Sequence, residues 1–68
     1  MKVDIGKSLK EHRESRDFNL TQLAKATGIS RQNLSRWETN EVTPNVLACI
    51  TIATFYGITL DELLSLHE

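Results

Sequence analysis

The chain of 68 residues contains a single cysteine, Cys49, and no long apolar segment. One cysteine excludes an internal disulfide and a zinc site built from four thiolates, which favours a reducing compartment. No apolar run approaches the ~20 residues of a membrane span, and the first residues lack the apolar core of a signal peptide. We therefore expect a cytoplasmic protein that is neither secreted nor inserted into a membrane.

Strand patterns are also nearly absent. Apolar residues do not alternate with polar ones over any long stretch, and they recur instead at intervals of three and four, which is typical of helices. Hydrophobic residues form 40% of the chain and charged residues 25%, as in an ordinary globular domain. The sequence predicts one compact all-α domain over residues 1–68, with a single core and no further domain.

Five helices are predicted from their start and stop signals. Capping boxes begin at Asn19 and Thr59, and Gly28 and Gly57 are expected to end the helices that precede them. The predicted helices cover about residues 4–16, 19–28, 31–39 and 45–56, and a short fifth helix that includes Leu63 and Leu64 begins at Thr59. The short turn after Gly28 joins the second and third helices, so residues 19–39 form a predicted helix-turn-helix.

The net charge of −1 averages two unlike halves of the chain. Residues 1–40 hold all eight basic residues and five acidic ones, a net charge of +3. Residues 41–68 hold four acidic residues and neither Lys nor Arg, a net charge of −4. Such an asymmetry favours nucleic-acid contact through one part of the surface.

The third predicted helix has one polar face and one mostly apolar face. On a helical wheel Leu34 and Trp37 point inward, whereas four polar residues share the opposite arc: Arg31, Gln32, Ser35 and Arg36. Arginine pairs with guanine and glutamine with adenine in the major groove, so this face suits base reading. The wheel alone leaves an ordinary solvated face as the alternative.

The segment from Leu23 to Glu38, LAKATGISRQNLSRWE, resembles the helix-turn-helix of the lambda repressor/Cro-like (XRE-type) DNA-binding domains. The other helices continue the resemblance, which covers nearly the whole chain. It implies a five-helix lambda repressor-like fold and a transcriptional regulator that binds specific double-stranded DNA, most simply a repressor. It implies base or groove contacts by Arg31, Gln32, Ser35 and Arg36.

The resemblance also assigns roles beside the reading face. It implies phosphate contacts or helix bracing by Ser30 and Asn33. In the loop after the third helix it leaves phosphate contacts to Asn40, Thr43, Asn45 and main-chain amides. It implies a largely buried ion pair between Arg13 of the first helix and Glu38 of the third. Two departures from the family pattern weaken the contacts expected with the DNA sugar-phosphate backbone. Leu20 stands where the family usually has Gln, and Glu41 lies in a loop that is commonly basic.

The last third of the chain holds more apolar residues than one core needs. Exposed apolar clusters mark interfaces, although a tiny domain also leaves some apolar atoms in water. Members of the family commonly pair through this region, so we expect a homodimer on a palindromic operator with half-sites ~34 Å apart. Its expected interface comprises Leu47, Phe55, Ile58, Leu60 and Leu66.

The competing hypothesis is a protein-interaction module, such as an antitoxin, whose main partner binds the surface of the last two helices. An enzyme is not indicated, because the only histidines, His12 and His67, have no partners arranged for catalysis. Cys49 and Trp37 lie among apolar positions and are interpreted as core residues. We expect no metal, no cofactor and no small-molecule ligand.

Overall fold

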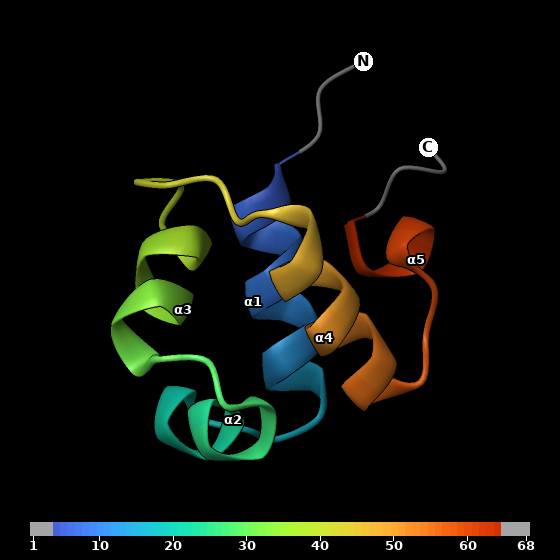
Figure 1. The fold of residues 1–68 in the computed structure, drawn as a ribbon, viewed down its shortest axis with the longest axis horizontal. Helices are drawn as coiled ribbons and strands as arrows, with labels where there is room; N and C mark the ends of the chain where they lie inside the picture. The colour runs from blue at the N-terminus through green and yellow to red at the C-terminus, as the bar shows by residue number, and fades with distance from the viewer. Residues whose placement is uncertain (1–3, 65–68) are drawn as a thin grey trace.

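The computed structural model describes residues 4–64, which form five helices and no strand. They are α1 (Ile5–Ser15), α2 (Leu20–Thr27), α3 (Arg31–Glu38), α4 (Val46–Tyr56) and α5 (Leu60–Leu64). The predicted all-helical fold is confirmed, the first four helices begin and end within two residues of their predicted bounds, and α5 begins beside its predicted start at Thr59. Helix α1 lies centrally, with α3 on one side and α4 and α5 on the other, while α2 packs against α3 and α4 (Figure 1).

Side-chain caps begin these helices, among them the two predicted capping boxes. The side chain of Asp4 accepts a backbone N–H of the first turn of α1 at 3.0 Å. Asn19 and Gln22 form a reciprocal capping box, with hydrogen bonds of 2.7 and 2.9 Å. Thr59 and Glu62 repeat this arrangement before α5, with backbone-to-side-chain bonds of 2.9 and 3.1 Å. Local sequence therefore determines where these helices start.

After four of the helices the chain changes direction at a residue whose backbone is in the left-handed conformation. Gly28 and Gly57 end α2 and α4 with φ values of +76° and +72°. Asp17 and Asn40 adopt φ values of 60° and 64° after α1 and α3. Asp and Asn are among the few residues with a side chain that tolerate this region. These tight reversals keep all five helices around one core.

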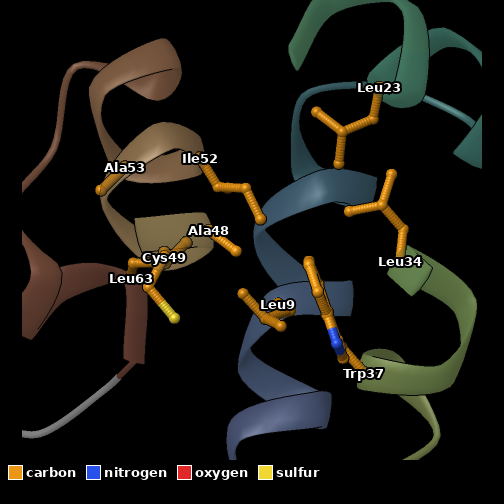
Figure 2. Packing of buried hydrophobic residues seen from close by; sticks show 9 residues of the cluster. All are labelled: Leu9, Leu23, Leu34, Trp37, Ala48, Cys49, Ile52, Ala53 and Leu63. Atoms are coloured by element: carbon orange, nitrogen blue, oxygen red, sulfur yellow. The ribbon is translucent and has the colours of Figure 1, made fainter. Parts of the chain in front are cut away.

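The core draws buried side chains from all five helices (Figure 2). Ile52 and Leu63 are almost completely inaccessible, and Trp37 faces inward with 7% of its surface exposed. Cys49 is 4% exposed, and burial raises the pKa of its thiol. The buried apolar residues are Leu9, Leu23, Leu34, Trp37, Ala48, Cys49, Ile52, Ala53 and Leu63. Between residues 4 and 64, no helix has the length and apolar character needed to cross a membrane.

Candidate nucleic-acid interface

The connection between α2 and α3 is short and internally bonded. The N–H of Gly28 donates to the carbonyl of Ala24 at 2.9 Å, which closes the last turn of α2. Ile29 then packs against the core, and Ser30 begins α3 by accepting the N–H of Asn33 at 3.1 Å. Because the turn has its own hydrogen bonds and an apolar anchor, it fixes the angle between the two helices.

The outward side of α3 carries the polar residues that the sequence predicted. Arg31, Gln32 and Arg36 are exposed, and Ser35 is half-buried. Among residues 4–64, no hydrogen-bond or ion-pair partner engages these four side chains. Leu34 occupies the opposite side and is 2% exposed. The helix therefore presents free donors and acceptors to solvent and its apolar side to the core.

A bidentate ion pair fixes the C-terminal end of α3 to α1. The Nε of Arg13 lies 2.8 Å from Oε2 of Glu38, and its Nη2 lies 3.0 Å from Oε1. A third bond runs from Nη1 of Arg13 to the carbonyl of Phe18 at 2.7 Å. The two side chains are only 11% and 8% exposed, and the hydrogen bonds to Glu38 raise the pKa of the guanidinium. Arg13 is thus engaged inside the protein and is not an exposed contact for DNA.

Asn40, which the resemblance placed among the phosphate contacts, is also tied to α1. Its Oδ1 accepts the N–H of Gly6 at 3.0 Å, and its Nδ2 donates to Oδ1 of Asp4 at 2.9 Å. This bond, followed by the one from the N–H of Lys7, lowers the pKa of Asp4. We call these contacts of Asn40 with Gly6 and Asp4 the α1–α3 latch. The left-handed conformation of Asn40 aims its amide at the start of α1.

The latch needs a residue without a side chain at position 6. A Cβ added to Gly6 would lie 2.6 Å from the carbonyl oxygen of Glu38 and 2.7 Å from that of Trp37. Such approaches are far shorter than a normal contact, so the end of α3 can lie this close only to glycine. A glycine inside a predicted helix is a signal of close packing, and Gly6 is such a glycine. The sequence does not show, however, that the end of α3 is the segment that packs against it.

The other expected phosphate residues surround α3. Thr43 and Asn45 are exposed in the loop after α3, and Asn45 accepts the N–H of Ala48 at 2.8 Å to cap α4. The Oγ of Ser30 serves as a cap, which leaves its O–H proton available as a donor. Glu41 is exposed in the same loop and adds a negative charge there. Ser30, Thr43 and Asn45 are neutral, and the loop after α3 therefore adds no positive charge.

The α5 helix is held against the face of α1 by a second polar cluster. The Nε2 of His12 lies 2.8 Å from the carbonyl oxygen of Glu62, so this nitrogen carries the proton that it donates. Nη1 of Arg16 donates to Nδ1 of His12 at 3.1 Å, and its guanidinium lies 4.3 Å from the ring centre of Tyr56. These contacts give His12 a structural position between α1 and α5.

The residues expected at a dimer interface are not equally exposed. Leu47 is 74% exposed, and Phe55 is 41% exposed with its ring against two other aromatic rings, 5.5 and 5.6 Å away. Ile58 and Leu60 are half-buried and pack against the core of the same chain. Leu66 lies outside the described residues. The most exposed of the four described residues is therefore on α4.

The five-helix fold, with the short turn between α2 and α3 and the exposed polar face of α3, defines a helix-turn-helix domain of the XRE type. The profile of the helix-turn-helix family matches residues 9–63, and the chain belongs to this family. The chain is 32% identical over 66 residues to the HTH-type transcriptional activator BcrR of Enterococcus faecalis, covering 97% of this chain and 32% of that protein.

A second relative comes from Escherichia coli K12. The HTH-type transcriptional regulator SutR is 34% identical over 61 residues, which cover 90% of this chain and 34% of that protein. The chain thus spans about a third of the length of either relative. No solved structure matches the chain significantly.

Proposed function

We propose that this chain is a DNA-binding transcriptional regulator that reads a specific double-stranded site with α3. The observation that carries the proposal is the exposed polar face of α3, whose side chains have no partner within residues 4–64 while its inner side is buried and paired to α1. Arg31, Gln32 and Arg36 carry the donors and acceptors that match guanine and adenine edges in the major groove. The names of the two relatives, both transcriptional regulators, support the same proposal.

The finer proposal is a homodimer on a palindromic operator that acts as a repressor. Two reading helices related by a two-fold axis would enter major grooves ~34 Å apart. Repression is the simplest result, because a protein that covers promoter DNA excludes other proteins from it. The Enterococcus faecalis relative is named an activator, so the test must be able to detect activation as well as repression. A reporter assay does so when the operator is placed in one reporter upstream of the promoter and in another within it.

Selection from random duplexes tests the proposal, because it reports binding, motif and half-site spacing together. On the selected site, Arg36→Ala is expected to cost ~1–3 kcal/mol and to relax the preference at one base pair. Lys10→Ala is the matched control, since it removes an exposed positive charge from α1 and leaves α3 intact. Equal losses for Arg36→Ala on selected and random DNA would show a phosphate contact. A failure to enrich any motif would refute specific binding.

A second candidate function is a protein-interaction module such as an antitoxin. The exposed apolar side chains of α4 favour it, because unpartnered apolar patches mark protein contacts. Gel filtration with light scattering separates a stable homodimer from a monomer. The duplex selection separates the two candidates, since a chain whose main partner is a protein is expected to enrich no DNA motif. A selected DNA motif would make this candidate unnecessary.

A further inference from the structure

The turn after α3 closes on the backbone of Arg36, one of the exposed polar residues of that helix. The carbonyl oxygen of Arg36 accepts the N–H of Glu41 at 2.9 Å. The N–H of Asn40 donates to the carbonyl of Trp37 at 3.2 Å. With Asn40 in the left-handed conformation, these two bonds form a Schellman motif. The last turn of α3 is therefore closed by the same residue that forms the α1–α3 latch.

The latch connects this turn to the start of α1. The Oδ1 of Asn40 accepts the N–H of Gly6, and its Nδ2 donates to Asp4, so both polar atoms of the amide are bonded. The end of α3 and the start of α1 meet at the same end of the molecule (Figure 1). A Cβ at position 6 would lie 2.7 Å from Oδ1 of Asn40, so glycine permits this bond. The backbone of Arg36 is thus linked to α1 through the side chain of Asn40.

We propose that Asn40 is a specificity-determining residue of α3 that acts through position: the latch fixes the place from which Arg36 reaches its base pair. This inference rests on the proposed reading of DNA by α3 and adds the residue that aligns Arg36 for it. It gives Asn40 this role in place of a contact with phosphate.

The first argument is that Arg36 depends on its backbone for alignment. Its side chain is exposed and has no partner within residues 4–64 that would hold it. A bidentate contact with guanine requires a set distance and orientation of the guanidinium, so a displaced backbone reduces discrimination between bases. Arg36 lies in the last turn of an eight-residue helix, and helix ends fray. The Schellman motif and the latch oppose this fraying.

The second argument is that the latch is separable from the Arg13–Glu38 pair. The pair is buried, and it is therefore expected to govern stability. The bond from Asn40 to Asp4 is exposed, and such a bond adds little to stability because water replaces the lost partner. Loss of the latch is therefore expected to change the discrimination between DNA sequences more than it changes folding.

The test measures a discrimination ratio: the affinity for the selected duplex divided by that for a duplex changed at the base pair where Arg36→Ala relaxes the preference. A bidentate arginine contact predicts a ratio of at least about fivefold for the unaltered chain. Asn40→Gly keeps the left-handed backbone without the amide, so the ratio is expected to fall at least about threefold. Glu41→Gln, an exposed change in the same loop, is the matched control and is expected to retain the ratio.

An exchange of side chains separates positioning from a phosphate contact. Asn40→Asp sets a carboxylate against that of Asp4, where the bond of 2.9 Å was made, so the latch should open and the ratio fall. In the double variant Asp4→Asn with Asn40→Asp, an amide again faces a carboxylate, and the ratio is expected to return to within about twofold of its original value. A phosphate contact predicts instead an equal loss on every duplex and no recovery, because the added negative charge remains.

Three outcomes would overturn the proposal while DNA binding stands: an unchanged ratio in Asn40→Gly, no recovery in the exchanged double variant, or no base pair that Arg36→Ala relaxes. Urea unfolding of each variant provides the fourth readout. Losses of discrimination that follow losses of stability from variant to variant would assign Asn40 to folding alone and refute its positioning role. If the selection enriches no motif, the proposed function itself fails, and this inference fails with it.

Discussion

Removing one partner of the Arg13–Glu38 pair is expected to destabilise the domain severely. Arg13 has a side chain that is only 11% exposed, and Glu38→Leu leaves its guanidinium facing apolar atoms where it made two hydrogen bonds of 2.8 and 3.0 Å. Breaking a buried pair in this way costs ~3–5 kcal/mol. A domain of this length has roughly 3–10 kcal/mol of total stability, so the variant is expected to be largely unfolded near 37 °C.

Replacing both partners should restore much of that loss. In Arg13→Met with Glu38→Leu, no charge stays buried, and well-packed apolar pairs are often as stable as the ion pair that they replace. The remaining cost is expected to be about 1 kcal/mol, because the carbonyl of Phe18 loses its donor. Urea unfolding, followed by the fluorescence of the buried Trp37, measures the stability of the unaltered chain, the two single variants and the double variant, which together form a double-mutant cycle.

The control uses the other carboxylate near the same arginine. Glu14 lies 4.0 Å from Nη2 of Arg13, but its side chain is 56% exposed, so Glu14→Ala is expected to cost under ~1 kcal/mol. If Glu38→Leu cost no more than Glu14→Ala, the pair would be hydrated in solution and the reasoning refuted. Additive losses in the double variant would likewise show that the two residues do not act as a unit.

Three further predictions concern the α1–α3 latch and a buried hydroxyl. Gly6→Ala forces a methyl group against two carbonyl oxygens, so we expect a loss of ~1–3 kcal/mol in thermal or urea unfolding, and a neutral result would refute the close approach. Because its pKa is lowered in the folded state, ionised Asp4 stabilises the domain above the ordinary pKa of 3.8, and this stabilisation is lost as the pH falls through the folded-state pKa. Asn40→Ala removes the main cause of the lowered pKa, so the free energy of unfolding should fall less steeply with decreasing pH. An unchanged dependence on pH in this range would contradict the latch. The Tyr56 hydroxyl is buried without a partner among residues 4–64, so Tyr56→Phe is expected to stabilise the domain by up to ~1 kcal/mol in urea unfolding, whereas a clear loss would reveal a hydrogen bond.

Local chemistry explains why so much of the backbone was predictable. Asn19 and Thr59 start helices through side-chain bonds to residues three positions away, and Gly28 ends one through its own φ value. Such signals lie within a few residues and can be read without the fold. The Arg13–Glu38 pair joins residues 25 positions apart, so it came from the resemblance and not from spacing.

The parts that were not predicted depend on tertiary contact. The amide of Asn40 bonds to residues 34 and 36 positions earlier, and no local pattern indicates that α1 begins beside the end of α3. Periodicity did not place Leu47 at the surface; it was predicted there because the last third of the chain holds more apolar residues than one core needs. Ile58 and Leu60, which were predicted for an interface, are half-buried against the core of the same chain, and their place in an interface stays a prediction.

These contacts together make α1 the support on which α3 is held. An eight-residue helix is too short to be stable alone, so the orientation of α3 is set by what holds it. The Arg13–Glu38 pair and the α1–α3 latch both act at its C-terminal end, while the turn through Ile29 fixes its N-terminal end. Substitutions on the inner side of α3 should therefore change DNA affinity and stability together. Substitutions of Arg31, Gln32 or Arg36 should change DNA affinity alone, and this separation distinguishes a reading face from an ordinary solvated one.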